Sequence, residues 1–320
     1  MFQNKKAYCE SLIKFLENDK LSVSMLFITR NKETNSYEVH KGTLADEISE
    51  ILRQMCHKMA KKSYCKPDLR TFKPYNPALR TSESTEYLDD KELKLIEPML
   101  NMISGTIIDL KKLDDDFLDN LWYYVIKFDD GKKQMLFYKK YSKSMVLTKG
   151  FALALTFKAG SFDKLKNHVF RIEDKADCIY YEDRLIIRCK GNFEKIFNFF
   201  QEIKKNALSA IKFIEEKLPF TIENFDTIKT QLMEHEIKMR KLNNIFATKT
   251  LEKIIPENIE PLIKEGLLKN ISVKKGTDGR LIISSTDPWE ILKILDDDLV
   301  RSRLTEINYE ASNKKQIWKW

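Results

Sequence analysis

Glycine, proline, cysteine and histidine are all scarce in this chain, which has 9 glycines, 8 prolines, 5 cysteines and 4 histidines among 320 residues. The glycines never form GxxxxGKS/T or GxGxxG, which excludes the common phosphate-binding loops of nucleotide enzymes. The motifs GxSxG and HExxH, typical of serine hydrolases and zinc peptidases, are also missing. The cysteines are widely spaced and no pair has zinc-site spacing, so we expect free thiols, no bound metal and no cofactor.

Long hydrophobic runs are missing as well. The longest, FALALTF at residues 151–157, is far shorter than the roughly 20 residues that cross a bilayer as a helix. Residues 1–20 contain no continuous apolar segment and are typical of an amphipathic helix, not of a signal peptide. Hydrophobic residues make up 42% and aromatic residues 11%, the composition of a folded protein. We therefore expect a folded, soluble and cytoplasmic chain.

Charge, in contrast, is abundant and unevenly placed. Charged residues make up 32% of the chain and the formal net charge is +8. Residues 58–80 contain seven basic residues and a single acid, so this block alone has most of the excess. Pro67, Pro74 and Pro77 interrupt it, which predicts an exposed extended loop within residues 58–85. Such a local block indicates a polyanionic partner, either nucleic acid or an anionic membrane surface.

Aromatic residues among these bases favour nucleic acid. Tyr64, Phe72 and Tyr75 lie in the loop, and basic side chains mixed with aromatic rings neutralise phosphates and stack against bases. Lysines also surround Tyr141, at Lys139, Lys140 and Lys143. The alternative is that the loop is only solvated surface or docks on an acidic protein. The predicted DNA contacts in the loop and near the end of the chain are Lys61, Lys62, Lys66, Arg70, Lys73, Arg301, Arg303, Lys314 and Lys315.

Strand and helix patterns alternate irregularly, which indicates an α+β fold with a mixed or antiparallel sheet, hairpins and long flanking helices. In LWYYVIKFDDGKKQMLFYKKY, Asp130 and Gly131 separate two alternating runs and predict a β-hairpin. From Asn192 the apolar spacing becomes that of a long helix, which ends before Pro219. We expect two regions, an N-terminal α+β region that contains the basic loop and a C-terminal α+β domain, at residues 1–115 and 116–320.

One further predicted helix has a repeat of seven residues. Its apolar positions step by 3, 4, 3, 4, 3 and 4 residues, the spacing of a coiled-coil seam that pairs with a second copy. A core helix packed inside the same chain would show the same spacing, so both interpretations stay open. If the helix pairs, the dimerisation residues are Phe225, Ile228, Leu232, His235, Met239, Leu242 and Phe246.

Acidic clusters raise the alternative of a metal-dependent nuclease, which needs two or three carboxylates around Mg²⁺ and a nearby lysine. In a chain with 48 acidic and 56 basic residues, an acid two positions before a lysine is expected by chance. The candidates are Asp109 with Lys111, residues 114–116, Glu173 with Lys175, and residues 296–298.

The last of these clusters, in LDDDLVRSRLTEINYEASNKKQ, has an ordinary structural explanation. On a helix, neighbouring side chains diverge by about 100°, so three consecutive aspartates cannot all face one metal ion. Asp298 is instead placed to pair with Arg301, three residues further along. This segment is therefore predicted to close the fold.

The same segment resembles a known family. ILKILDDDLVRSRLTEINYEASNKKQI is similar to the ending of the B-protein family of Kiwa, a two-component bacterial anti-phage defence system. In that family a helix with Leu-x-Asp-Asp precedes a Ser-x-Leu-Thr step, a tyrosine and a lysine. Glu306 stands where the family usually has glycine. FRIEDKADCIYYEDRLIIRCKGNFEKIFNFFQEI also looks like the family, and the likeness covers about residues 120–315. The matching positions near the end are Leu295, Asp297, Asp298, Ser302, Leu304, Thr305, Tyr309 and Lys314.

The resemblance implies a cytoplasmic DNA-binding partner of a four-span membrane protein, with which the family assembles as dimers at the inner membrane. The membrane protein senses phage attack, and the B component engages phage DNA and blocks its replication and late expression. Under this interpretation the chain binds DNA largely without sequence specificity and is not an enzyme. Two alternatives stay open: a Mg²⁺-dependent nuclease, and a non-catalytic scaffold whose basic loop binds the membrane partner or anionic lipid.

Overall fold

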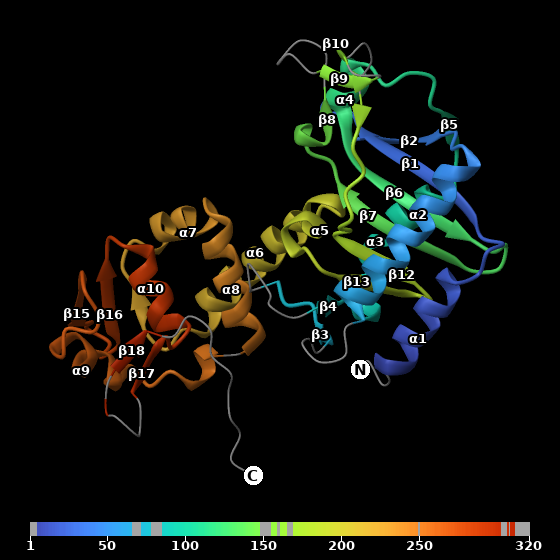
Figure 1. The fold of residues 1–320 in the computed structure, drawn as a ribbon. Helices are drawn as coiled ribbons and strands as arrows, with labels where there is room; N and C mark the ends of the chain where they lie inside the picture. The colour runs from blue at the N-terminus through green and yellow to red at the C-terminus, as the bar shows by residue number, and fades with distance from the viewer. Residues whose placement is uncertain are drawn as a thin grey trace. The chain divides into compact units, whose positions relative to one another are not determined.

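The chain forms two compact units, Met1–Asn76 with Thr81–Asn198 and Pro77–Arg80 with Phe199–Trp320 (Figure 1). The computed structural model describes residues 5–65, 72–77, 85–147, 155–158, 161–164, 169–248, 250–301, 306 and 308–310. Both units combine helices with sheets, so the α+β class is confirmed. The units divide between Asn198 and Phe199 and not near residue 115, because strands from both sides of residue 115 share one sheet.

The first unit is built on a nine-stranded sheet. Its strands are β1 (Ser22–Arg30), β2 (Tyr37–Gly42), β3 (Phe72–Pro74), β4 (Thr85–Tyr87), β5 (Ile107–Asp109), β6 (Leu121–Asp129), β7 (Gln134–Lys140), β12 (Cys178–Tyr181) and β13 (Arg184–Ile187). They lie in the order β3-β4-β13-β12-β7-β6-β1-β2-β5, antiparallel except at the outer pairs β3–β4 and β2–β5. The predicted hairpin is confirmed as β6–β7, and Gly131 in its turn has a φ of 85°. Shorter strands form two further pairs, β8 (Val146–Leu147) with β11 (Val169–Phe170), and β9 (Leu155–Lys158) with β10 (Ser161–Lys164).

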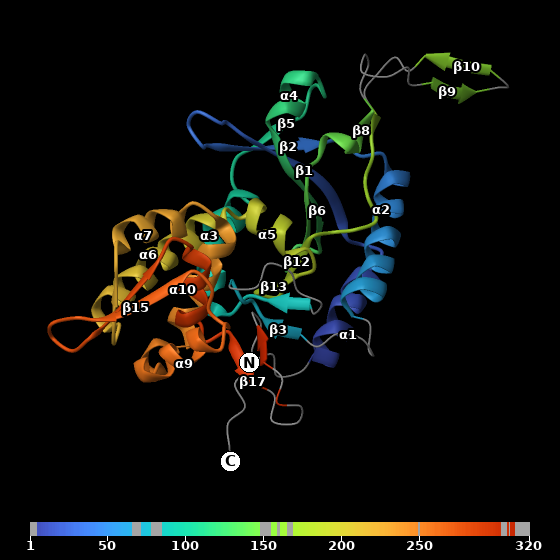
Figure 2. The ribbon, with the colours of Figure 1, turned by 90° about the vertical axis from the view of Figure 1, so that its left-hand side faces the viewer.

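Helices cover both faces of the large sheet. They are α1 (Lys5–Leu16), α2 (Asp46–Met59), α3 (Asp90–Met102), α4 (Asp115–Asn120) and α5 (Lys190–Ile196), with a 3-10 turn at η2 (Lys143–Met145). Figure 2 shows α1 and α2 on one side of the sheet and α3 and α5 on the other. Along β6, Tyr124, Ile126 and Phe128 belong to the hydrophobic core beneath α1 and α2. On the opposite face, the Tyr138 ring lies 5.1 Å from the Phe197 ring, which follows α5.

The extended loop predicted at residues 58–85 is wrong over its first part. α2 continues into a π-helical segment, η1 (Ala60–Tyr64). Ala60 and Tyr64 are buried, and the Tyr64 hydroxyl donates a hydrogen bond of 2.8 Å to the Ala176 carbonyl oxygen. Ala60 and Tyr64 are four residues apart and so lie on one side of the helix, where both are buried. The prolines that predicted a loop lie further along the chain. Residues 66–71 and 78–84 of the predicted loop lie outside the described residues.

The second unit packs helices against a small sheet. Three strands form this sheet in the order β14-β16-β15, and their bounds are β14 (Thr221–Ile222), β15 (Ile271–Lys275) and β16 (Leu281–Ser285). A separate ribbon joins β17 (Leu299–Arg301) to β18 (Asn308–Glu310). The helical segments are α6 (Phe199–Lys217), α7 (Phe225–Met233), α8 (Glu236–Thr248), η3 (Thr250–Lys253), η4 (Pro256–Asn258), α9 (Ile259–Lys264) and α10 (Pro288–Leu295). Of the described helices in either unit, none has the length and apolar character needed to span a bilayer.

Two predicted long helices are each divided in two. The helix expected from Asn192 to before Pro219 is interrupted at Asn198, whose φ is 56°, and this break falls at the end of the first unit. The helix with the seven-residue repeat is interrupted at residues 234–235, between α7 and α8. Neither site contains a glycine or proline, but Asn198 is in the left-handed conformation, which asparagine adopts at helix ends more readily than most residues.

Most of the seven-residue repeat packs inside the second unit. Ile228, Leu232, Met239 and Leu242 are buried in its hydrophobic core. Phe225 packs against that core while half-buried, and the exposed positions are His235 and Phe246. The Phe246 ring also contacts the ring of Phe213 in α6, 5.5 Å away and edge-on. Pairing with a second copy stays a prediction, and the four buried side chains already have partners within the chain.

Candidate nucleic-acid interface

Three of the predicted phosphate contacts lie in the described part of the first unit. Lys61 and Lys62 are exposed on η1, and Lys73 is exposed on β3. Lys61 Nζ lies 3.5 Å from Glu17 Oε1, so its charge is partly compensated. Neither Lys62 nor Lys73 has an acidic partner among the residues that the structure describes. Arg301 ends β17, and the remaining predicted contacts lie outside the described residues, namely Lys66, Arg70, Arg303, Lys314 and Lys315.

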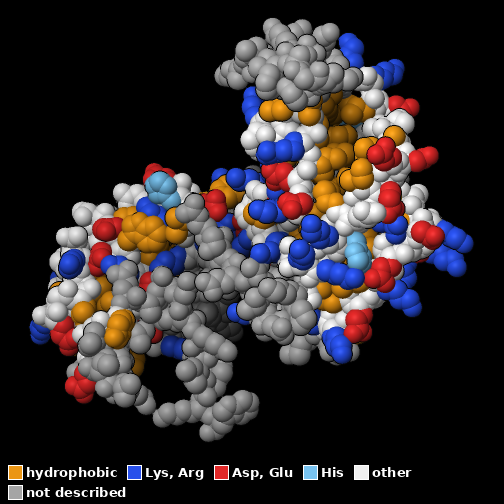
Figure 3. Space-filling model, viewed as in Figure 1, with side chains coloured by type: hydrophobic (Ala, Val, Ile, Leu, Met, Phe, Trp, Pro, Cys, Tyr) orange, Lys and Arg blue, Asp and Glu red, His pale blue; other side chains and the backbone are white. Residues whose placement is uncertain are grey.

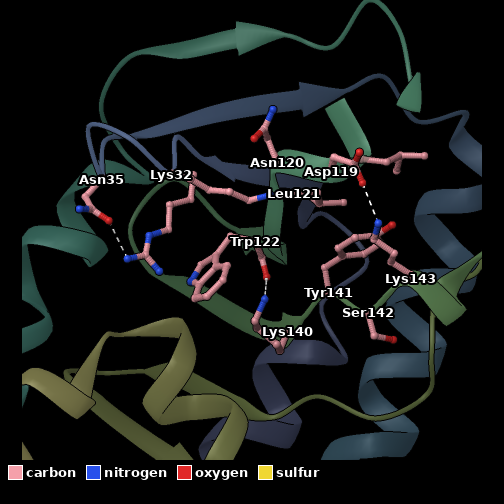
Figure 4. A pocket seen from close by; sticks show the side chains of 12 residues that line it. Lys32, Asn35, Asp119, Asn120, Leu121, Trp122, Lys140, Tyr141, Ser142 and Lys143 are labelled. Carbon is pink, nitrogen blue, oxygen red and sulfur yellow. Dashed lines mark hydrogen bonds and ion pairs between the residues drawn. The ribbon is translucent and has the colours of Figure 1, made fainter. Parts of the chain in front are cut away.

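A second basic site lies at one edge of the nine-stranded sheet. β1 and β7 end there and β6 begins there, because antiparallel pairing places Thr29 opposite Leu121 and Tyr123 opposite Lys140. Between the β1–β2 turn and the end of β7 is a cavity of about 390 Å³ (Figure 4). It is lined by Arg30, Lys32, Asn35, Leu118, Asp119, Asn120, Leu121, Trp122, Lys140, Tyr141, Ser142 and Lys143, and we call it the strand-edge pocket.

Trp122 organises the cations of the strand-edge pocket. The Arg30 guanidinium carbon lies 4.7 Å from the centre of an indole ring, and Lys140 Nζ lies 3.6 Å from it, both within cation–π range. Lys140 Nζ also donates a hydrogen bond of 2.6 Å to the Trp122 carbonyl oxygen, the dashed contact below the ring in Figure 4. The indole nitrogen donates to the Lys195 carbonyl oxygen at 3.2 Å. The hydrogen bond to Lys195 thus fixes the indole ring, against which Arg30 and Lys140 both lie.

The charges of the strand-edge pocket are not balanced by acids. Its single acid, Asp119, pairs with Lys143 at 2.8 Å, and this contact lowers the pKa of Asp119. Within the described part of the chain, neither Arg30 nor Lys140 has a carboxylate within ion-pair distance, and Arg30 Nε is buried without a hydrogen-bond partner. Burial, reinforced by the positive charges of Lys195 and Arg30, lowers the pKa of Lys140 to about 8.

Elsewhere, bases and acids are mixed. On the face shown in Figure 3, Lys and Arg side chains are interspersed with Asp and Glu over both units. Lys139, the neighbour of Lys140 on β7, illustrates this: its Nζ lies 3.0 Å from Glu173 Oε2 and 3.5 Å from Asp177 Oδ1. The lysines predicted around Tyr141 therefore have different roles, and only Lys140 presents an uncompensated charge. The strand-edge pocket thus gathers Arg30, Lys32 and Lys140 around one acid, Asp119, which is paired with Lys143.

The sequence indicated only part of this site. The sequence indicated Lys140 and Lys143, because they lie beside Tyr141, but it gave no indication of Arg30 or Trp122. Arg30 ends a strand some ninety positions before β6, and the pairing of β1 with β6 is what brings the two residues together. The signal that was present is a basic residue at the end of a strongly hydrophobic strand, SVSMLFITR.

The acidic clusters considered for a nuclease are dispersed in the described residues. Asp109 ends the edge strand β5, and Asp114 caps α4 by accepting a hydrogen bond from the Phe117 amide. Glu173 is engaged by Lys139. Among the residues that the structure describes, no group of three or more histidine, cysteine, aspartate or glutamate side chains could hold a metal ion.

The three consecutive aspartates close the second unit. They follow α10 instead of lying on it, since Asp296 is its C-cap and Asp297 has a φ of 52°. Lys241 of α8 donates to Asp296 Oδ2 at 3.1 Å and also to Asp298 Oδ2, and both carboxylates are almost fully buried. Asp298 therefore pairs with Lys241. The predicted pair with Arg301 involves a side chain that lies outside the described part of the chain, and it stays a prediction. This buried ion-pair network joins α8 to the end of α10.

Comparison with known proteins identifies the family. A family model described as Kiwa protein KwaB-like matches residues 118–305, which is more than half of the chain. The matched segment includes Trp122 and Lys140 and extends to the closing segment after α10. Searches of curated proteins and of solved structures gave no match. The resemblance predicted from the aspartate-rich segment is confirmed, and the chain belongs to the KwaB-like family of Kiwa proteins.

Proposed function

We propose that this chain is the DNA-binding component of a Kiwa defence system and that it binds DNA through phosphates at the strand-edge pocket. Membership of the KwaB-like family places the chain in Kiwa anti-phage defence. The observation that carries the proposal is the pair Arg30 and Lys140, held against Trp122 without an acidic partner among the described residues. Cations that are partly desolvated and repel each other are stabilised by an anion, and DNA supplies anions in series.

The proposed binding does not depend on base sequence. Arg30 and Lys140 lie over the Trp122 indole ring, and in this proposal their charges neutralise phosphates and do not read base edges. Lys62 and Lys73 are exposed and supply further phosphate contacts in this proposal. A protein bound along phage DNA without cleaving it would hinder its replication and late expression, which is the role that we propose.

The proposed partners are DNA, a four-span membrane protein and a second copy of the chain. Association with the membrane protein would place the chain at the inner membrane, although none of its described helices spans a bilayer. Self-association through the seven-residue repeat would have to use its exposed positions, His235 and Phe246, because the buried ones form the core of the second unit.

Fluorescence anisotropy with a labelled DNA duplex tests the proposed function. We expect the double variant Arg30→Gln/Lys140→Gln to lose about tenfold or more in affinity at ~100 mM salt, since two charge-assisted contacts are removed. Lys132→Gln is the matched control: Lys132 is exposed in the β6–β7 turn, at the opposite end of the strands that form the pocket. Equal affinities for the double variant and the control would contradict the proposal. Intact DNA after incubation with Mg²⁺ is also expected, and cleavage would favour the nuclease instead.

A further inference from the structure

We propose that the strand-edge pocket is a site for a phosphate monoester, such as the terminal phosphate of a DNA strand. This inference rests on the proposed function and names the group that the pocket selects. The shared chemistry is a phosphate with three terminal oxygens, whether it ends a DNA strand or belongs to a free nucleotide. Internal phosphates of the duplex would bind the same pocket less tightly and would also contact other exposed basic side chains, such as Lys62 and Lys73.

The charge of the pocket fits a dianion. Lys143 and Asp119 compensate each other, which leaves three lining cations, Arg30, Lys32 and Lys140. A phosphodiester has one negative charge, whereas a phosphate monoester has between −1.5 and −2 near neutral pH, by roughly the same second ionisation as a phosphorylated side chain. The monoester therefore compensates more of the charge that the pocket concentrates.

The hydrogen-bond donors also fit a terminal phosphate. Lys140 Nζ uses one of its three N–H groups on the Trp122 carbonyl oxygen. Arg30 uses Nη2 on Asn35 Oδ1 at 2.8 Å and has further N–H groups on the same guanidinium. These donors, with the exposed Lys32 at the rim, match an acceptor group with three free oxygens, while an internal phosphate offers only two.

The shape of the pocket limits which phosphates can enter. Figure 4 shows Lys32 and Asn35 on one side of Trp122 and Tyr141, Ser142 and Lys143 on the other. A recess of about 390 Å³ between these walls admits a strand end or a nucleotide. An internal phosphate of a duplex is flanked by sugars on both sides and sits on a convex surface, so it enters such a recess less readily. Because Trp122 already has cations against its ring, no particular base is selected.

Binding of a dianion would also protonate the pocket. Burial of the Lys140 amine lowers its pKa, and the positive charges of Lys195 in α5 and Arg30 in β1 lower it further. Asp177 raises this pKa. A bound dianion adds a second group that raises this pKa above about 8. Proton uptake at pH 8 to 8.5 is therefore expected, and calorimetry in buffers of different ionisation enthalpy measures it.

Competition between matched duplexes tests the inference. The probe is one duplex sequence in three forms: with 5′-phosphates, with 5′-hydroxyls, and as a closed circle. A parallel titration compares the binding of deoxyadenosine monophosphate with that of deoxyadenosine, which tests a free nucleotide. We expect about tenfold tighter binding of the phosphorylated ends by the unmodified chain, with the circle equal to the hydroxyl form. Arg30→Gln/Lys140→Gln should abolish this preference, and Lys132→Gln should keep it. Lys32→Gln, an exposed turn position, should reduce it even if the double variant fails to fold.

Each outcome separates this inference from the proposed function. Binding of all three duplexes with equal affinity would overturn the inference and leave DNA binding intact. Binding of deoxyadenosine monophosphate without binding of any duplex would overturn the proposed function and support the phosphate site. Loss of the end preference in Lys132→Gln as well as in Lys32→Gln would show that the preference does not come from the pocket, and would also overturn the inference.

Discussion

At the scale of single residues, Lys139 and Lys140 show how strand geometry divides neighbouring charges. They follow each other on β7, so their side chains leave opposite faces of the sheet. Burial acts to lower the pKa of Lys139, but Asp177 and Glu173 outweigh it and raise that pKa. Lys140 has no such partner among the described residues, and burial with Lys195 and Arg30 lowers its pKa to about 8. The sequence alone could not show that one of these two adjacent lysines has acidic partners and the other has none among the described residues.

Lys140→Met tests this difference through the pH dependence of stability. The folded-state pKa of about 8 lies below the ordinary value of 10.5, so the unfolded chain binds more protons between these values. The cost of the charged lysine is therefore complete below pH 8 and is relieved as the pH rises towards 10.5. We expect Lys140→Met to be at least as stable as the unmodified chain at pH 7.5, and to lose that advantage by pH 10. Urea unfolding measures both; a difference that does not change with pH would contradict the assignment.

A second residue-scale prediction concerns the turn of the β6–β7 hairpin. Gly131 has a φ of 85°, a conformation that costs other residues about 1 kcal/mol or more. Gly131→Ala is therefore expected to lower the free energy of unfolding by about 1 kcal/mol. Gly191, in α5, is not in this conformation and has open space around its Cα, so Gly191→Ala should be neutral or stabilise by up to about 1 kcal/mol. Equal effects of the two substitutions would contradict the account.

At the scale of elements, the sequence predicted features that depend on neighbouring residues, but not those that depend on contacts between distant segments. Asp130 and Gly131 predicted the central hairpin because turn chemistry is local. The breaks at Asn198 and at residues 234–235 were missed, since no glycine or proline marks them. The seven-residue repeat indicated buried positions correctly for Ile228, Leu232, Met239 and Leu242, but periodicity does not say which surface buries them. Here that surface belongs to the same unit.

The contact between α8 and the end of α10 gives the element-scale prediction. Lys241→Met removes the cation shared by two buried carboxylates, Asp296 and Asp298. Breaking a buried pair in this way costs about 3–5 kcal/mol, and urea unfolding measures the loss. The control is Lys274→Met, which removes an exposed pair with Glu223 and should change stability far less, because exposed ion pairs contribute little. A Lys241→Met effect as small as that of the control would contradict a stabilising role of this network.

At the scale of the whole molecule, family membership was predictable and the site was only partly so. The aspartate-rich segment after α10 carried the family signal, although its aspartates serve structure and pair with Lys241. The α+β class followed from local patterns, but the division between units did not, because β1 and β6 join in one sheet across residue 115. The same long-range pairing brings Arg30 to Trp122, so the strand-edge pocket could be found only in the folded structure.

The salt dependence of DNA binding tests the central claim most directly. For duplex DNA, the logarithm of the affinity falls against the logarithm of salt concentration with a slope of about 0.9 for each phosphate neutralised. Anisotropy titrations between ~50 and ~200 mM salt give this slope for the unmodified chain, Lys132→Gln and Arg30→Gln/Lys140→Gln. We predict a slope that is smaller by about 1 to 2 in the double variant only. A double variant with the slope and affinity of the unmodified chain would contradict phosphate binding at the strand-edge pocket.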